Sequence, residues 1–468
     1  MLSLISAVPY FAFLYWLLRR HPAMIMAQVL LLFSFTLRVV CTLYVDLFGP
    51  IYSTDLGFDL GPGASTTLFV FSTLSVFAAT FWAYHRLRID SGKLGRTLLG
   101  LPQSFISNVA LAGYGALILG NFSEMLVSGH IPLFEGMDRL EYAGRYGTVF
   151  YAFTYEFHFL IATLLGYLFA ITRLSSGSFD YRFLAVLAIL IIFFMLTGNR
   201  FSVFLLYISF FLMGASAVSV AKAKGIRLSD PSRRQVTILR LLERSRGLQL
   251  AVGAICLLVF AGVLLNSFFN VRYADAELGR AALFQRSLVQ PVELYEVTWQ
   301  RIGAGELTNS SLAWDLMFDN PIDPTRNTGI QYLMVAAMGE SRATDVLEQN
   351  SQSAGGYPEV IIELFGLPGF LLPMAAAALV YAFLLHRILI SAVYGRAMTM
   401  LASVYILIGI SVFYTGGMLN FLLQTTFWIK ITIWLVLLAA EPLLMRAPYR
   451  RAQRGGGPQA LADYGNSP

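Results

Sequence analysis

The chain has 468 residues, of which 57% are apolar and only 13% are charged, and its mean hydropathy is +0.66. A soluble protein of this length needs about twice that charged fraction to cover its surface, so the composition excludes a soluble globular protein. The net charge of +6 says nothing about nucleic acid until the charges are assigned to the two sides of a membrane.

Apolar segments of ~17–26 residues, the length that crosses a bilayer, follow one another along the chain. The sequence therefore predicts an all-α polytopic integral membrane protein with about 11 transmembrane helices. Eight of the segments fall in residues 1–269 and three in 358–445, and an Arg- and Gly-rich tail, expected to be disordered, occupies 446–468. The segments lie at about 2–18, 23–48, 65–84, 104–127, 149–171, 183–197, 201–218, 248–269, 359–385, 398–415 and 421–445.

The basic residues assign the two sides of the membrane. Twenty-two of the 33 Lys and Arg residues fall in connections that strict alternation places on one face, and the positive-inside rule makes that face cytoplasmic. The N-terminus is then outside and the C-terminus inside. The most basic of these connections, Lys222–Arg246, is interpreted as a topology determinant, with an interfacial helix on anionic membrane lipids as the alternative.

Two outer connections are long. The first, 121–148, has 28 residues, and the second, 270–357, has 88. The second is rich in aromatic residues, and Ala281–Arg301 shows the apolar spacing of a helix. We therefore expect 270–357 to form a small helical cap on the outer face of the bundle.

The basic residues of the outer connections are all arginines. Guanidinium groups match phosphate oxygens in a bidentate fork and stay charged when partly desolvated, so they suit a pyrophosphate-linked lipid at the membrane surface. The alternative is that they pair with the 11 acidic residues of the long loop, which outnumber its six arginines. The candidates for pyrophosphate binding are Arg139, Arg145, Arg200, Arg272, Arg280 and Arg286.

Carboxylates and one histidine near the outer face are candidates for proton transfer. Glu359 is the first candidate for a catalytic base, because Glu359 and Glu363 share one helix face at the mouth of the predicted span 359–385. Asp138 and His158 are further candidates. A helix-dipole partner is the alternative for Glu359, and a satisfied core group is the alternative for His158.

Other polar groups fall within the predicted spans. Arg38 is expected to snorkel to the outer interface, and Lys430, about nine residues into the last span, requires a partner near the midplane. The sequence has no P-loop, HExxH, GxSxG or DxD motif, and Cys41 and Cys256 both lie in spans. We therefore expect arginines rather than a metal to neutralise a leaving pyrophosphate, and no cofactor.

Three stretches of the sequence resemble the Wzy-type polymerases of bacterial surface polysaccharide. Residues 131–134 with 138–142 are similar to the first periplasmic loop of that family, and 197–200 are similar to its Gly-x-Arg turn. Residues 355–359 with 363–366 are similar to its re-entry into the membrane after the long loop.

The resemblance implies a GT-C-like integral glycosyltransferase in the bacterial inner membrane. Such an enzyme transfers the growing glycan from one undecaprenyl pyrophosphate to a new lipid-linked repeat unit. Arginines that match the family's loop arginines would hold the donor and acceptor pyrophosphates, and Tyr142 and Tyr357 would contact the glycan. A chain-length regulator is an expected partner, and nucleic acid is not.

Two alternatives stay open. An O-antigen ligase-type glycosyltransferase would use similar substrates, but the related ligases carry a histidine in the long loop, and 270–357 contains none. A flippase or transporter of lipid-linked sugars would be expected to show inverted repeats and midplane charges in broken helices. Of the charged residues, only Lys430 fits that pattern.

Overall fold

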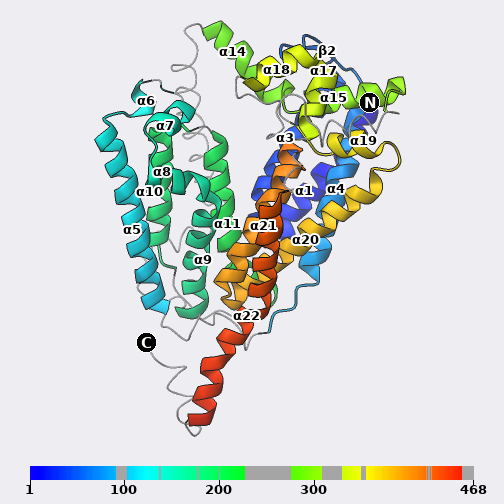
Figure 1. Cartoon of the computed structure of the whole chain (residues 1–468). Coiled ribbons are helices and arrows are strands. Elements are labelled where there is room, and N and C mark those ends of the chain that lie inside the picture. Colours follow the sequence, from blue (N-terminus) through cyan, green and yellow to red (C-terminus); the bar gives the residue numbers. More distant parts are fainter. Residues whose placement is uncertain are drawn as a thin grey trace. The chain divides into compact units, whose positions relative to one another are not determined.

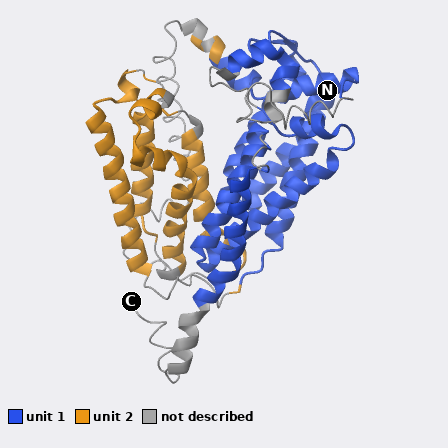
Figure 2. Ribbon diagram, viewed as in Figure 1, with its two compact units in different colours: residues 1–89, 283–468 blue, residues 90–282 orange. Residues whose placement is uncertain are grey.

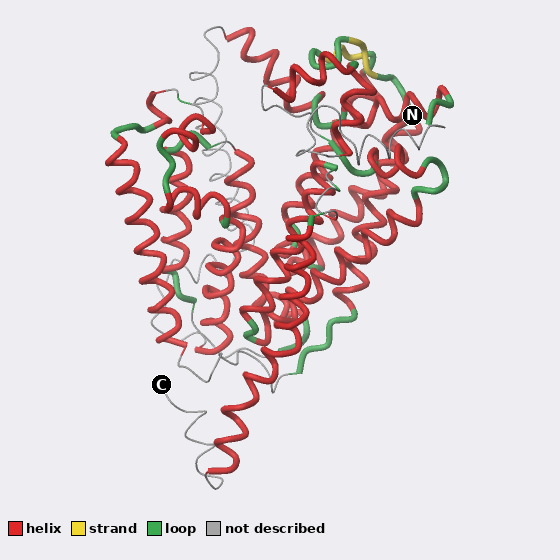
Figure 3. The backbone as a smooth tube through the Cα atoms, in the orientation of Figure 1, coloured by secondary structure: helices red, strands yellow, loops and turns green. Residues whose placement is uncertain are grey.

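The computed structural model describes residues 1–90, 103–135, 137, 139–176, 179–199, 201–226, 276–307, 329–348, 355–417, 419, 422 and 424–455. In these residues the regular structure is helical except for one two-stranded sheet (Figure 3). Eight of the described helices are long and apolar enough to cross a membrane, or nine if the bent pair α8–α9 is one span. This confirms an all-α polytopic membrane protein. The predicted span 248–269 lies outside the described residues.

The chain forms two compact units (Figure 2). Unit 1 comprises residues 1–89 and 283–468, and unit 2 comprises residues 90–282. The sequence grouped 1–269 as one block of spans, whereas the structure groups the first spans with the last ones. The grouping differs because segments distant in the sequence pack together, and such packing cannot be predicted from hydropathy alone.

Unit 1 contains a helical bundle (Figure 1). Helix α4 packs on α1, α3 and α20, α20 packs on α21, and α21 packs on α22. Its helices are α1 (Leu2–Arg20), α2 (Pro22–Ala27), α3 (Val29–Phe48), α4 (Ser65–His85), α20 (Leu371–Tyr394), α21 (Ala397–Gly416) and α22 (Thr425–Gly455).

One end of this bundle carries short elements that we call the cap. A hairpin of β1 (Ile51–Ser53) and β2 (Phe58–Leu60) packs with them, in an antiparallel register that places Tyr52 opposite Asp59. Leu60, Val292, Leu333 and Val360 belong to one buried apolar cluster, which holds the hairpin and the cap helices together. The helices are η3 (Gln285–Val289), α15 (Glu293–Ala304), α17 (Gly329–Met338), α18 (Glu340–Glu348) and α19 (Glu359–Phe365).

Three predicted boundaries in unit 1 were wrong. The predicted span 359–385 is two helices, because α19 ends at Phe365, and Gly366, with φ of 67°, and Pro368 follow before α20 begins. The segment 23–48 is broken at Gln28, between α2 and α3. Residues 446–455, expected to be disordered, continue α22 to Gly455.

Unit 2 contains four long helices and several shorter ones. Helix α9 lies against α11 so closely that a Cβ on Gly166 would be 1.9 Å from the Phe211 carbonyl oxygen. A bend of 71° separates α8 from α9. The helices are α5 (Gln103–Ser128), α6 (Pro132–Glu135), α7 (Arg139–Arg145), α8 (Val149–Glu156), α9 (His158–Ser176), α10 (Arg182–Leu196) and α11 (Phe201–Ala223), and α14 (Ala276–Phe284) spans the boundary of the two units.

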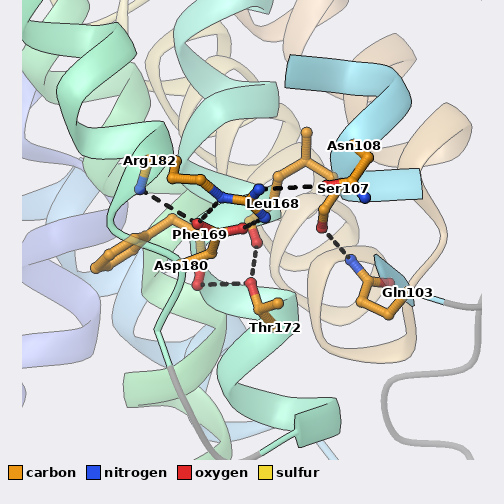
Figure 4. A network of polar contacts seen from close by, with 8 residues as sticks. All are labelled: Gln103, Ser107, Asn108, Leu168, Phe169, Thr172, Asp180 and Arg182. Carbon is orange, nitrogen blue, oxygen red and sulfur yellow. Dashed lines mark hydrogen bonds and ion pairs between the residues drawn. The ribbon is translucent and has the colours of Figure 1, made fainter. Parts of the chain in front are cut away.

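A polar network ties the start of α5 to the start of α10 (Figure 4). The Arg182 guanidinium donates to both carboxylate oxygens of Asp180, at 2.9 and 2.7 Å, and to Asn108 Oδ1 at 3.2 Å. These hydrogen bonds lower the pKa of Asp180. Asn108 lies 13 residues before Asn121 on α5, about 20 Å at 1.5 Å per residue, so this network occupies the opposite end of α5 from the groups described below.

Candidate functional site

A buried guanidinium connects α3 to the cap in unit 1. Arg38 is only 4% exposed, and its Nε donates to the Pro291 carbonyl at 2.9 Å. Its Nη1 donates to the Tyr357 carbonyl, and its Nη2 lies 2.7 Å from Glu359 Oε1. The same group sits 4.8 Å from the centroid of the Phe69 ring. All three nitrogens therefore bind atoms from distant parts of the same chain.

The expectation that Arg38 snorkels to the interface was wrong. A charged group in an apolar interior is stable only when its partners replace water, and here two carbonyls and one carboxylate do so. Lys430, in the predicted span 421–445, places its Nζ 4.4 Å from the centroid of the Tyr405 ring, a cation–π contact.

A second buried network lies at the start of α4. Asp46 accepts hydrogen bonds from the backbone N–H groups of Ser65 and Thr66 at 3.2 and 2.9 Å, so it caps α4 from the end of α3. The Ser65 hydroxyl contacts Asp46 and also Glu296, and the Tyr295 hydroxyl donates to the Ser65 carbonyl at 2.6 Å. This network attaches α15 of the cap to the two spans.

Glu296 is a titratable group within that network. Burial raises the pKa of Glu296 to about 8, with the Ser65 hydrogen bond opposing this rise and the Asp46 carboxylate adding to it. At neutral pH the protonated form is therefore favoured, and it can share its proton with the neighbouring oxygens. Sequence reasoning missed Asp46, Ser65 and Glu296, and the only signal was that Glu296 lies in the predicted helix 281–301.

Two other arginines of the outer connections bind groups of their own unit. Arg301 Nε lies 3.1 Å from Glu363 Oε1, and Arg342 Nη2 donates to the Thr54 carbonyl at 2.8 Å. Burial raises the pKa of Glu363, and Arg301 opposes this rise. For these two arginines, pairing within the protein accounts for the side chain.

Glu359 and Tyr357 are fully buried. Glu359 Oε1 accepts from Arg38 and from the Gly356 N–H. The Tyr357 hydroxyl donates to the Ser72 carbonyl at 2.9 Å, and its ring lies 4.8 Å from that of Tyr414. The re-entry motif thus holds the cap against the bundle. Glu359 Oε2 is buried and has no hydrogen-bond partner among the described residues.

The first outer loop contributes exposed ionic groups to unit 2. Arg145 pairs with Glu141 at 2.8 Å, with both side chains largely exposed, and His130 Nδ1 lies 2.8 Å from Glu135 Oε2. Tyr142, in contrast, is buried, and this burial raises the pKa of its hydroxyl. Exposed pairs of this kind contribute little to stability, so Arg145 can exchange Glu141 for an anion at small cost.

Seven aromatic rings form a continuous series in unit 2, which we call the aromatic row. Successive ring centroids lie 4.4, 6.0, 5.3, 5.9, 6.3 and 5.7 Å apart. The row begins in the first outer loop and passes through α8 and α9 to α11. Its members in order are His130, Tyr146, Tyr142, Tyr151, Tyr155, His158 and Tyr207.

Polar side chains gather at the bend between α8 and α9. The carbonyl groups in the last turn of a helix have no partner within the helix, and here side chains supply partners. His158 Nδ1 lies 2.6 Å from the Tyr155 carbonyl oxygen, and the Tyr207 hydroxyl lies 3.5 Å from the Thr154 carbonyl oxygen. Asn121 of α5 donates to the Thr154 hydroxyl at 2.7 Å.

The remaining predicted site residues are placed in part. Arg286 is exposed on η3, and the backbones of Arg139 and Arg280 belong to α7 and α14. Across the residues that the structure describes, no three His, Cys, Asp or Glu side chains gather as a metal site. The predicted residues outside the described ones are Asp138, Arg200 and Arg272.

Comparison with known proteins gives one match. Residues 323–429 match a family of unknown function, DUF6418. The matched segment includes α19, α20 and α21, and so it contains Tyr357 and Glu359, which contact Arg38, and Glu363, which pairs with Arg301. No curated protein and no solved structure matches the chain.

We expect loss of either partner of the Arg38–Glu359 pair to destabilise unit 1. Arg38→Met and Glu359→Leu should each lower the free energy of unfolding by about 3–5 kcal/mol, because each leaves one buried charge without its counterion. The double variant should lose less than the sum of the two. Thermal unfolding in detergent measures this effect. The matched control is Arg145→Met with Glu141→Leu, an exposed pair with an expected coupling of about 1 kcal/mol or less. Additive losses at Arg38 and Glu359 would contradict the assignment.

The raised pKa of Glu296 predicts that the stability of the protein depends on pH. Because its pKa is raised from 4.5 to about 8 in the folded state, its contribution is fully present below about pH 4.5 and is lost as the pH rises through 8. Unfolding midpoints measured between pH 5 and 9 should therefore fall less steeply for Glu296→Gln than for the natural protein. The exposed Glu306 supplies the control, Glu306→Gln. Equal slopes for Glu296→Gln and the natural protein would refute the assignment.

Proposed function

We propose that this protein is a polymerase of undecaprenyl-pyrophosphate-linked oligosaccharide repeat units. It acts at the periplasmic face of a bacterial inner membrane, with the N-terminus periplasmic and the C-terminus cytoplasmic. The growing glycan leaves its undecaprenyl pyrophosphate and is transferred to a hydroxyl of a new lipid-linked unit. The proposal includes the GT-C class.

The observation that carries this proposal is the aromatic row. Aromatic faces pack against the apolar faces of sugar rings, while tyrosine hydroxyls and histidine nitrogens bind sugar hydroxyls. His130, Tyr146, Tyr155 and His158 of the row are partly exposed, whereas its other three rings are buried. A row that begins in a surface loop and continues into a membrane bundle suits an extended glycan attached to a lipid.

Arginines of the outer connections support a pyrophosphate ligand. Arg145 is the last residue of α7 and lies in the sequence between Tyr142 and Tyr146 of the aromatic row. Its side chain is 68% exposed. Arg286 is exposed on η3, and Arg139 and Arg280 complete the set that matches the family resemblance. Their forks would neutralise the charge that develops on the leaving pyrophosphate without a metal ion.

The buried network of unit 1 serves this function indirectly. Arg38 and Glu359 hold the cap on the bundle, and so they fix the position of η3 with Arg286. The proposal therefore assigns Glu359 a positioning role and no longer uses it as the catalytic base. The flippase alternative is weaker, because Arg38 and Lys430, which lie in described spans, are engaged with partners of their own unit.

Deletion of the gene distinguishes the three functions. We expect a strain without this protein to carry surface lipid with a single repeat unit, because transfer stops at the first unit. Gel electrophoresis of the surface glycolipid measures its length. Intact polymer on undecaprenyl pyrophosphate would indicate a ligase, and loss of all exported glycan would indicate a flippase. Either result would refute the polymerase.

Arginine-to-lysine exchange tests the pyrophosphate site. Arg145→Lys and Arg286→Lys keep the charge but lose the bidentate fork, so we expect each to shorten the glycan distribution in the complemented deletion strain. Arg182→Lys, in the polar network at the start of α10 (Figure 4), is the control and should give the natural length. Natural length in both test variants would remove these arginines from the site.

A further inference from the structure

The hydrogen bonds at the α8–α9 bend determine the chemistry of His158. A carbonyl oxygen only accepts hydrogen bonds, so the 2.6 Å contact with the Tyr155 carbonyl places the proton of the neutral ring on Nδ1. Nε2 is then a hydrogen-bond acceptor and a base. This atom is buried, and among the residues that the structure describes it has no hydrogen-bond partner.

The orientation of Asn121 follows from the same argument. Its Nδ2 lies 2.9 Å from the Leu117 carbonyl oxygen and 2.7 Å from the Thr154 hydroxyl. The carbonyl identifies that atom as the nitrogen, so Oδ1 is the other atom. The Asn121 side chain is 1% exposed, and within the described part of the chain its Oδ1 has no donor.

These two acceptors belong to one cluster. Asn121 contacts the side chain of Thr154, Tyr207 contacts the carbonyl of Thr154, and the rings of Tyr207 and His158 lie 5.7 Å apart. A buried acceptor without a donor costs about 1–3 kcal/mol. Two such acceptors in one cluster can bind a group that donates hydrogen bonds, and a hydroxyl group does so.

The bend also places this cluster near the membrane surface. Helix α9 begins at His158 and has 19 residues, about 28 Å at 1.5 Å per residue, which nearly equals the ~30 Å hydrocarbon core. Helix α8 is turned by 71° relative to it and contributes little to the crossing. Tyr155 and His158, which lie next to each other in the aromatic row at this bend, are both partly exposed.

We propose that His158 and Asn121 bind the acceptor hydroxyl of the lipid-linked sugar, and that His158 Nε2 takes its proton. This inference rests on the proposed polymerase function. The hydroxyl oxygen forms the new bond to the anomeric carbon of the donor, and the bond from that carbon to the pyrophosphate oxygen breaks. The pyrophosphate leaves with the electron pair, and the imidazolium then releases its proton to water.

Kinetics of the purified full chain test this role. The substrate is the lipid-linked repeat unit extracted from the deletion strain. We expect His158→Gln, which retains a donor for the Tyr155 carbonyl, to lower kcat about 100-fold or more. It should also abolish the acidic limb of the pH profile. The other ionisable groups around the ring are Glu156 and Tyr155 of α8 and Tyr207 of α11. This variant leaves them unchanged, so loss of the acidic limb would report on His158.

Asn121→Leu tests the second acceptor. We expect it to raise KM about tenfold, because one hydrogen bond to the hydroxyl is lost. Asn108→Leu, a like change at the other end of α5 (Figure 4), is the control and should leave KM unchanged. If the natural protein polymerises the unit and His158→Gln has the same kcat and pH profile, the inference is overturned. The proposed function is then unaffected.

Chemical modification of the natural protein tests substrate binding at His158 without a variant that could misfold and without catalytic turnover. Diethylpyrocarbonate modifies unprotonated histidine nitrogens, and peptide mass spectrometry reads each of the five histidines separately. We expect the lipid-linked unit to slow modification of His158 at least threefold and to leave the rate at His386 unchanged. An unchanged rate at His158 would overturn the inference even if the natural protein shows no polymerisation.

Discussion

Unit 1 depends on the burial of one guanidinium group. Arg38 replaces its lost water with the carbonyls of Pro291 and Tyr357 and the carboxylate of Glu359, and these atoms come from the two ends of the cap. A buried charge without such partners is costly, so α3 and the cap are stable only together. The Asp46–Ser65–Glu296 network adds a second attachment of the cap to the spans.

Unit 2 has a different organisation, in which a bend rather than an ion pair creates the polar site. The turn at Phe157 ends α8, and side chains from α9 and α11 then serve carbonyls of its last turn. The same hydrogen bonds leave Nε2 of His158 and Oδ1 of Asn121 as acceptors. The structural requirement of the bend and the chemistry proposed for it therefore have one origin.

Hydropathy was sufficient to predict most of the spans, because the apolar residues that mark a span are consecutive in the sequence. Apolar spacing likewise predicted a helix over 281–301, which the structure divides among α14, η3 and α15. The role of Arg38 could not be predicted, since its partners lie 253 to 321 residues away. The bend at Phe157 has no Gly or Pro to indicate it. Glu359 was placed at the mouth of a span because the break after Gly366 was not recognised, and the aromatic row was missed because its rings come from four separate segments.

The central claim is that the protein joins lipid-linked repeat units by itself. The most direct test is the purified chain in lipid nanodiscs, supplied with only the lipid-linked repeat unit from the deletion strain and no divalent metal. Mass spectrometry of the released glycan gives its length. We expect a ladder of two or more units, with one free undecaprenyl pyrophosphate formed for each new linkage. Single units alone, with no undecaprenyl pyrophosphate released, would contradict it.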